Sequence, residues 1–567
     1  MIKRLISLFV RCYFNFQKIR FSDFQIKSYF YQKSIPMRYL ISLLFIAFIV
    51  SLSSCRKDFD TVPSSGDLRF SKDTVYLDTV FTNIGSSTYT LKVYNRSSDD
   101  IKIPTIQLGK TDSKYRMMID GLTGLDEDNN GYGDGRIFND IELLAKDSMY
   151  IFIETTADIT DIANNNPTEF LYTDDILFDN GSKQQKVNLV TLIKDAYFLY
   201  PKRDANGIKE NLLLGVDTNG DEVRINGFEL DSNDPINGNE FEFNNTKPYV
   251  VYGYAGVPSG QTLNIQQGAR VYFHAESGIV VQPGASLNIN GQSSPDNNPQ
   301  LNEVTFEGDR LEPLYEDVTG QWGAIWMRDG STSNIKHLTL KNATVGLLVE
   351  NCTLDIENSQ IYNSANYGIL ARSATMNNCK NLVVNLAGQA ALACSLGGSY
   401  DFRHCTFNNN WASSNQLAVL LTNYEEQADG SNLTGALTQA NFFNCIIYGS
   451  NNVEFLMDDI KEIDGNDQTP FIKDLRYCLF KFRDAGTSLS RKEAYDFIRD
   501  GENGNLKNIN PNFFDANRNK LNISDDPDGG AFQKGSIDYI IAADILGHPR
   551  TSNPPDLGAY QSAAFPE

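Results

Sequence analysis

Positive charge is scarce in this sequence. Its 567 residues include 49 Lys and Arg against 71 Asp and Glu, which gives a formal net charge of −22 at pH 7. Residues 1–54 hold eight basic residues and one acidic residue, so the charge falls to −29 once they are removed. Such a surface repels nucleic acid and anionic lipid. It also disfavours a polyanionic substrate such as pectate, unless a local basic cleft or Ca²⁺ intervenes.

Histidine and helical periodicity are scarce as well. Only four histidines are present, and none of the others lies near the pair His404-Cys405, which argues against a metal site there. Few segments repeat apolar residues at helical spacing, whereas glycine (42 residues) and asparagine are abundant. This composition predicts an all-β, turn-rich protein. The length of the chain predicts two or more domains.

Only one long apolar run occurs. Residues 37–55 read MRYLISLLFIAFIVSLSSC, in which the apolar stretch is too short to span a membrane comfortably. The run resembles a bacterial lipoprotein signal, which implies that residues 37–54 are removed and Cys55 is lipidated. The alternatives are a plain signal peptide or an anchor helix. Residues 1–36 fit no targeting segment, so we expect Met37 to be the true start and the upstream stretch to be an extension of the gene model.

The segment after the cysteine is short and polar. Residues 55–66 contain Pro, Ser and Gly and are expected to form a tether. The Lys57-Asp58 pair close to the cysteine resembles the export signal of Bacteroidetes surface lipoproteins. This resemblance implies an outer-membrane protein that is held by its lipid and exposed on the cell surface.

Strand patterns dominate residues 67–195. Stretches such as STYTLKVYNRS and DSMYIFIETTA alternate apolar and polar residues, which is the period of a half-buried antiparallel strand. They predict a β-sandwich. The stretch FSKDTVYLDTVFTNIGSSTYTLKVYNRSSDDIKI resembles the Ig-like modules that precede other domains in Bacteroidetes surface lipoproteins. Residues 196–248 are expected to form a connector or cap.

A repeating pattern begins at Tyr249. The segments VGLLVEN, YGILARS and AALACSL follow one plan, and Gly346, Gly368 and Ala390 are spaced 22 residues apart. This spacing predicts the coils of a solenoid, in which equivalent residues stack about 4.8 Å apart. Residues 249–485 resemble the right-handed parallel β-helix of the pectate-lyase-like superfamily.

The cysteines also suggest a repeat. The segments NCKNL, HCTF, NCII and YCLF predict a ladder of buried thiols, in which His404 takes the slot before the cysteine. Disulfides are possible in an exported chain, but side chains stacked on parallel strands point the same way, so we expect free thiols. The predicted thiol ladder consists of Cys379, Cys405, Cys445 and Cys478, and the slot before it of Asn378, His404, Asn444 and Tyr477.

Residues 486–567 are expected to form the last coils and a cap. Residues 489–505 have the pattern of one amphipathic helix. The ending DILGHPRTSNPPDLGAYQ resembles the closing motif of many bacterial β-helix proteins. It predicts that Arg550 pairs with Asp556 and that Tyr560 packs on the last coil, covering its open edge.

The acidic loop LDEDNNGYGDGRIF is the best metal candidate. Gly131 stands at position 6 of an EF-hand-like count, but Ile137 replaces the bidentate Glu of position 12. The loop therefore predicts a Ca²⁺ site that stiffens the chain, and its alternative is a solvated turn. The predicted ligands are Asp126, Asp128, Asn130 and Asp134.

Catalytic candidates are few. Glu350 and Arg372 lie one coil apart and, with Lys341 and His337, suit a lyase; the alternative is an ion pair between coils. A glycosidase would instead need close carboxylates. The carboxylates available for it are Asp355, Glu357 and Asp401.

Three tryptophans, Trp322, Trp326 and Trp411, are candidates for stacking on a sugar, with core packing as the alternative. Polar inserts at 425–439 and 458–470 are expected to leave the side of the solenoid, where inserts often shape a binding face. The first hypothesis is a surface protein that binds a polysaccharide or a surface protein without catalysis and needs no cofactor, with the sandwich as spacer. The second is a polysaccharide lyase or glycoside hydrolase, and a purely structural envelope role is the third.

Overall fold

The computed structural model describes residues 60–565, apart from 65, 164, 166, 180, 218, 296, 297, 299, 428 and 461–468. The predicted upstream extension, the signal peptide and Cys55 lie outside the described residues. The chain divides between Lys194 and Asp195 into two compact units. No helix within the described part of the chain is long and apolar enough to cross a membrane.

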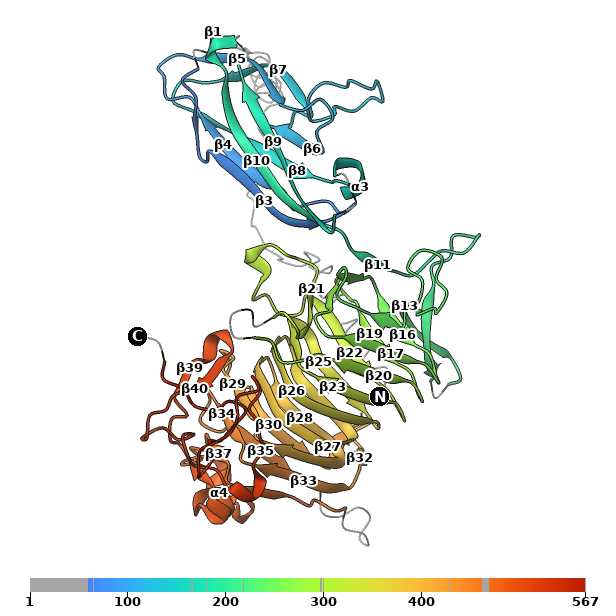
Figure 1. The fold of residues 1–567 in the computed structure, drawn as a ribbon, viewed down its shortest axis with the longest axis vertical. Coiled ribbons are helices and arrows are strands. Elements are labelled where there is room, and N and C mark those ends of the chain that lie inside the picture. Colours follow the sequence, from blue (N-terminus) through green and yellow to red (C-terminus); the bar gives the residue numbers. More distant parts are fainter. Residues whose placement is uncertain are drawn as a thin grey trace, which may run out of the picture. The chain divides into compact units, whose positions relative to one another are not determined.

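The first unit is a sandwich of two sheets (Figure 1). Along its strands, residues alternate between buried and exposed, so each sheet turns one apolar side toward the other and the core lies between them. One sheet contains β1 (Val62–Pro63), β3 (Thr74–Phe81), β5 (Ile101–Leu108), β7 (Ile137–Leu143), β9 (Glu169–Phe178) and β10 (Gln185–Lys194). The other contains β2 (Arg69–Phe70), β4 (Tyr89–Tyr94), β6 (Tyr115–Ile119) and β8 (Ser148–Thr155).

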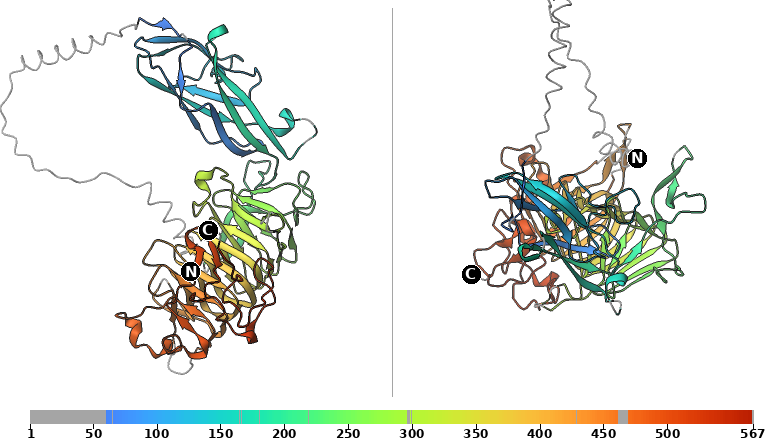
Figure 2. Two further views of the ribbon diagram at one scale, coloured as in Figure 1. Left: turned by 60° about the vertical axis from the view of Figure 1, so that its left-hand side comes forward. Right: turned by 90° about the horizontal axis from the view of Figure 1, so that it is seen from above.

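The second unit is a parallel β-helix. Figures 1 and 2 show its strands stacked side by side, from green to orange along the chain. Each strand pairs in parallel with the equivalent strand of the next coil, and the apolar core fills the inside. The predicted all-β fold, a sandwich followed by a β-helix solenoid, is confirmed.

The coils have three faces, which we call A, B and C. Strands β26 (Thr353–Ser364), β27 (Tyr367–Ala387) and β28 (Ala390–Arg403) bend from one face to the next. Face A also contains β14 (Glu242–Phe243), β17 (Thr262–Gln266), β20 (Ser286–Asn290), β23 (Thr332–Lys336), β33 (Leu437–Phe443) and β36 (Asp474–Arg476). Face B also contains β11 (Tyr197–Leu199), β15 (Tyr249–Val251), β18 (Arg270–Phe273), β21 (Val304–Gly308), β24 (Leu338–Lys341), β29 (Thr406–Asn409), β34 (Ile446–Gly449), β37 (Leu479–Phe480) and β38 (Leu506–Lys507). Face C also contains β13 (Glu222–Glu229), β16 (Tyr254–Val257), β19 (Gly278–Val281), β22 (Trp322–Met327), β25 (Ala343–Glu350), β30 (Leu417–Thr422) and β35 (Phe455–Asp458).

The thiol ladder has three members, not four. Cys379 lies opposite Phe402 and Val383 opposite Thr406, so the slot of Cys405 is filled in the preceding coil by Leu382 and not by a thiol. The predicted alignment was wrong by three residues, because NCKNL contains two asparagines and the second, Asn381, takes the positive-φ position before the ladder. The remaining thiols, Cys405, Cys445 and Cys478, are fully buried and free, as expected.

His404 belongs to a ladder at the corner between faces A and B. Its backbone has a positive φ of 50°, and burial lowers its pKa well below the usual range, so its ring is neutral. It contacts the Asn444 amide at 3.0 Å through Nε2. Within the described chain it belongs to no group of metal-ligating side chains. The equivalent positive-φ residues are His337, Asn358, Asn381, Asn444 and Tyr477.

The C-terminal segment does not cap the last coil as predicted. It returns along face B (red in Figure 2), where Tyr560 belongs to the same buried apolar cluster as Val383 of β27. Arg550 is buried and donates to the Gly558 carbonyl at 2.8 Å and to Asn381 at 3.1 Å, and no ion pair with Asp556 forms among the described residues. The predicted helix at 489–505 shrinks to α4 (Asp496–Arg499), flanked by 3₁₀ turns.

Candidate functional site

A row of amide and carboxylate side chains runs along the outside of face A. Successive strands turn every second residue inward, and residues such as Leu263 and Ile265 are fully buried. The residue between them, Asn264, therefore points outward, and the same position recurs in each coil. The central row consists of Glu242, Asn264, Asn288, Asn334, Asp355, Asn378, Asp401, Asn441 and Asp474.

Two further rows flank the central row. The hydroxyl row consists of Thr262, Ser286, Thr332, Thr353, Thr375 and Ser399. The row on the other side is longer and more charged, and consists of Gln266, Asn290, Lys336, Glu357, Lys380, Arg403, Phe443 and Arg476.

The middle of the central row is free to bind. At its start, Asn264 donates to Glu242 at 2.8 Å and Asn288 donates to Asn264 at 3.1 Å. Within the part of the chain that the structure describes, Asn334 and Asp355 have no side-chain hydrogen bond. Thr332 and Thr353 beside them are exposed. These groups offer both donors and acceptors to a ligand rich in hydroxyl groups.

Most charges near the central row are neutralised locally. Lys336 pairs with Glu357 at 2.7 Å across neighbouring coils. Asp401 accepts hydrogen bonds from the Arg403 guanidinium at 2.7 Å and from the Asn441 amide at 3.1 Å. Face A therefore presents polar groups without a large excess of positive or negative charge.

The three carboxylates considered for a glycosidase do not lie together as a catalytic pair. Asp355 and Asp401 lie in the same row, two coils apart with Asn378 between them, whereas Glu357 lies in the flanking row and pairs with Lys336. Two coils span about 10 Å, near the upper limit for an inverting glycosidase. Because Asp401 forms an ion pair with Arg403, Asp355 and Asp401 do not form a free acid–base pair.

Arg372 and Glu350 are held in an ion cluster on face C. Glu350 pairs with Arg372 and accepts from the Trp326 indole at 2.6 Å. A third member, Glu425 of the insert strand β31 (Tyr424–Glu426), pairs with Arg372 at 2.7 Å. Burial opposes the charge, but the two carboxylates raise the pKa of Arg372 above its usual range, so it stays charged. The sequence did not reveal Glu425, because it lies in an insert with no coil spacing.

Lys341 is not part of this cluster. It lies on face B, where its ammonium pairs with Glu307 at 2.8 Å. His337, at the corner, has its pKa lowered by burial and contacts the Asn358 amide at 3.3 Å. The proposed lyase residues are thus spread over two faces and a corner and do not converge.

The three tryptophans occupy different surroundings. Trp322 is 1% exposed, stacks on Phe273 with ring centroids 4.3 Å apart, and so belongs to the core and offers no face to a ligand. Trp326 is half-buried on face C beneath the Arg328 guanidinium. Trp411 is half-buried in the turn after β29. None of them lies in the central row of face A.

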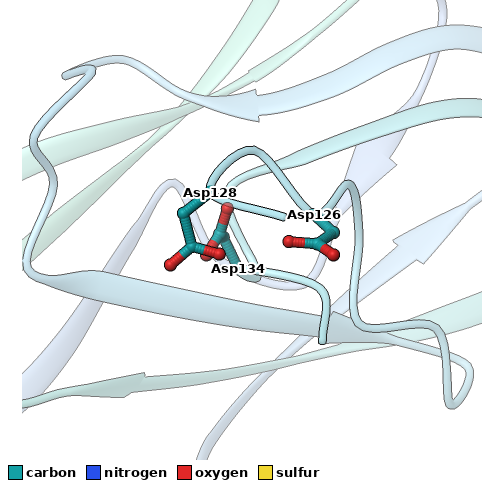
Figure 3. Close-up of side chains that lie close together, drawn as sticks. All are labelled: Asp126, Asp128 and Asp134. Carbon is teal, nitrogen blue, oxygen red and sulfur yellow. The ribbon is translucent and has the colours of Figure 1, made fainter. Parts of the chain in front are cut away.

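The acidic loop of the sandwich gathers three of its four predicted ligands (Figure 3). Carboxylate oxygens of Asp126, Asp128 and Asp134 lie within 4.8 Å of one another. The Asn130 side chain lies beside this group, since its NH₂ donates to Asp128 at 2.9 Å, while its oxygen accepts from the Tyr132 backbone at 2.9 Å. A backbone hydrogen bond from Gly131 keeps the pKa of Asp126 below its usual range. Three clustered carboxylates suit a hard cation such as Ca²⁺.

No protein-family profile and no curated protein matches the sequence. Among solved structures, PapD-like domain 7 of human CEP192 is similar over 24% of this chain and 89% of its own, with 11% identity and a TM-score of 0.14. A family 123 glycoside hydrolase from Clostridium perfringens is similar over 24% and 30%, with 6% identity and a TM-score of 0.16. The catalytic domain of a GH87 α-1,3-glucanase in complex with nigerose covers 70% and 81%, with 10% identity and a TM-score of 0.16. These low scores carry no functional argument.

Proposed function

We propose that this protein is an exported, lipid-anchored surface protein that binds an uncharged polysaccharide along face A and does not cleave it. The observation that carries the proposal is the central row, whose middle residues Asn334 and Asp355 are unpartnered in the described chain while hydroxyls flank them. Uncharged sugars present hydroxyl groups that both donate and accept, which is what amide, carboxylate and hydroxyl side chains complement.

The repeat of the solenoid supports a polymeric ligand. Equivalent side chains recur about every 4.8 Å along the axis, which is close to the advance of one sugar unit in an extended polysaccharide. A chain lying along the central row would meet similar groups at each coil. The net charge of −22 disfavours uronate polymers, because their carboxylates would be repelled.

A binding function is favoured over an enzymatic one by the state of the charges. Catalysis requires charged side chains that converge in a cleft. Arg372, Glu350 and Lys341 are each held in ion pairs, on two different faces. A polysaccharide can bind an open face through many weak contacts without such convergence.

The binding test uses the chain from residue 56 onwards and a panel of neutral and uronic polysaccharides, with and without Ca²⁺. Retention on each polymer and release of new reducing ends or unsaturated products are followed in the same samples. We expect retention on a neutral polymer without cleavage. Cleavage would contradict the proposal and would direct attention to Asp355 and Asp401. Absence of retention on every polymer would also contradict it and would favour a protein partner.

A double variant localises the binding. Thr332→Ala with Asn334→Ala removes two exposed groups from β23, which should weaken binding by about 1–3 kcal/mol, or about five- to 150-fold. Thr90→Ala with Asn139→Ala is the matched control, since both are exposed strand residues of the sandwich. Equal loss in both variants would contradict a site on face A.

The lipid anchor, the outer-membrane location and the resemblance to pectate-lyase-like β-helices are part of the same proposal. Cys55 carries the lipid, residues 55–66 tether the protein to the outer membrane, and the Ig-like sandwich spaces a right-handed, pectate-lyase-like β-helix from the cell surface. What supports this is the lipoprotein-like run before Cys55. Cys55→Ala should abolish incorporation of labelled fatty acid in a bacterial host; continued incorporation would contradict the assignment.

A further inference from the structure

The first coil of the solenoid contains a cavity of about 260 Å³. Its walls come from β14, from the loops on both sides of β14 and from the two strands of face B that start the solenoid. The lining residues are Tyr197, Leu199, Asn237, Asn239, Glu240, Glu242, Asn244 and Tyr249. Two carboxylates, three amides and two phenol rings therefore surround the space.

The cavity lies at the end of the central row. Glu242 lines the cavity and is also the first residue of that row, where it accepts from the Asn264 amide. The row ends there, because β14 is the first strand of face A. A polymer that lies along the row thus reaches the cavity with its end.

Several polar groups of the lining are available. The second carboxylate oxygen of Glu242 has no hydrogen-bond partner among the described residues. The side-chain oxygens of Asn239 and Asn244 accept from backbone amides at 3.1 and 2.8 Å, whereas their NH₂ groups donate to no described atom. These groups supply one acceptor and two donors to a bound molecule.

The rest of the lining is fixed in place. Glu240 is 6% exposed and accepts from the Asn237 amide and from the Asp231 backbone, both at 3.0 Å. Burial raises the pKa of its carboxyl. The rings of Tyr197 and Tyr249 lie 5.0 Å apart, and Tyr249 stacks on Phe243 at 4.0 Å. Preorganised walls of this kind reduce the entropy lost on binding.

The size of the cavity limits the ligand. Sites for drug-sized molecules measure roughly 300–1,000 Å³, so a cavity of about 260 Å³ suits one sugar ring rather than an oligosaccharide. Within the lining, the Glu242 carboxylate disfavours an acidic sugar.

We infer that this cavity holds the terminal sugar of the uncharged polysaccharide that lies along face A, so that the protein recognises chain ends. This inference rests on the proposed function and adds the position and polarity of the bound chain. Polymer interiors bind the central row alone, and chain ends bind the row and the cavity together.

The test compares chains of one composition and different lengths. The neutral polysaccharide that retains the chain from residue 56 is partially hydrolysed with acid and separated into fractions longer than the row. Each fraction competes, at equal mass, with binding to the immobilised polymer. Recognition of ends predicts that potency at equal mass rises with the number of chain ends, whereas lateral binding alone predicts equal potency at equal mass.

Two variants address the cavity directly. Tyr197→Ala removes one wall and Glu242→Gln removes the free acceptor's charge at constant shape; each should weaken binding of the shortest fraction at least tenfold. The matched controls, Tyr76→Ala and Glu142→Gln, alter exposed residues of the sandwich and should bind like the unchanged protein. Circular dichroism checks that all four variants are folded.

The outcomes separate the two proposals. Potency that follows chain ends, together with loss in both cavity variants, supports end recognition. Potency that follows mass, with unchanged cavity variants and a weakened Thr332→Ala/Asn334→Ala variant, overturns end recognition but keeps binding on face A. If no polysaccharide binds, both proposals fall.

Discussion

Glu454 makes the stability of the solenoid depend on pH. Its carboxyl lies in the turn between β34 and β35 and is fully buried. One oxygen accepts from the Asn451 backbone at 2.6 Å, whereas the other has no partner among the described residues. The Gln416 side-chain oxygen nearby also lacks a donor. Burial raises the pKa of Glu454 to about 8, so the folded protein keeps this carboxyl protonated at neutral pH.

The sign of the effect follows from the difference between the two states. The unfolded carboxyl titrates near 4.5, so between pH 4.5 and 8 the folded state binds more protons than the unfolded state. The stabilisation is complete below pH 4.5, falls as pH rises through this window, and is lost above pH 8. A difference of about 3.5 pKa units corresponds to a decrease on the order of 5 kcal/mol in the free energy of unfolding across this window.

The perturbation is Glu454→Gln, which keeps the shape and removes the titration. Thermal unfolding is followed at pH 5, 6, 7, 8 and 9 for the variant, the unchanged chain and the exposed control Glu493→Gln. We expect the unchanged chain and the control to lose stability between pH 5 and 8 relative to Glu454→Gln, with no further divergence above pH 8. Parallel pH profiles for all three proteins would refute the argument that Glu454 is buried as an acid.

Three further predictions concern other parts of the molecule. Arg372→Met leaves two carboxylates unpaired, so it should destabilise the solenoid by about 3–5 kcal/mol in thermal melts while the affinity of the folded protein for polysaccharide is unchanged; a loss of affinity without destabilisation would contradict this and place Arg372 in the binding site. Ca²⁺ should bind the acidic loop with a dissociation constant of about 10⁻⁴–10⁻³ M, because position 12 lacks its bidentate ligand; calorimetry should show the heat abolished in Asp126→Asn but kept in Asp161→Asn, and a heat kept in Asp126→Asn would contradict the site. The six cysteines of the chain from residue 56 should resist a thiol reagent in the native protein and all react on unfolding; fewer than six without reductant would indicate a disulfide.

The sequence was informative where one residue pattern has one physical cause. The two-residue period in 67–195 predicts strands that are buried on one side, and the sandwich contains them. The 22-residue spacing of Gly346 and Gly368 predicts coils, and β25 and β27 pair in parallel accordingly. The pair Glu350 and Arg372 was open between catalysis and an ion pair, and the geometry places it in an ion pair.

Predictions failed where the pattern depended on packing between distant segments. The C-terminal motif contains an arginine and an aspartate, and a local pair was the simplest expectation. In the fold, Arg550 is covered by the solenoid and meets Asn381, which lies 169 residues earlier in the chain. No local signal reports such a partner. The return of this segment along face B was missed for the same reason, since its apolar residues fit a cap equally well.

The central row of face A was visible in the sequence and was still missed. The tripeptides TLN, SLN, TSN and TLD occupy residues 262–264, 286–288, 332–334 and 353–355, with a hydroxyl first and an amide or carboxylate third. The cysteines that suggested the alignment of the coils point inward, where packing selects only for size. A shift of three residues there still brings an apolar side chain to the core. Outward positions face water, so nothing in the packing of the core requires Asn or Asp at the same place in eight strands, with Glu242 in the first. Core packing explains the buried thiols, but it does not explain the polar row. The row is therefore the better evidence for a ligand.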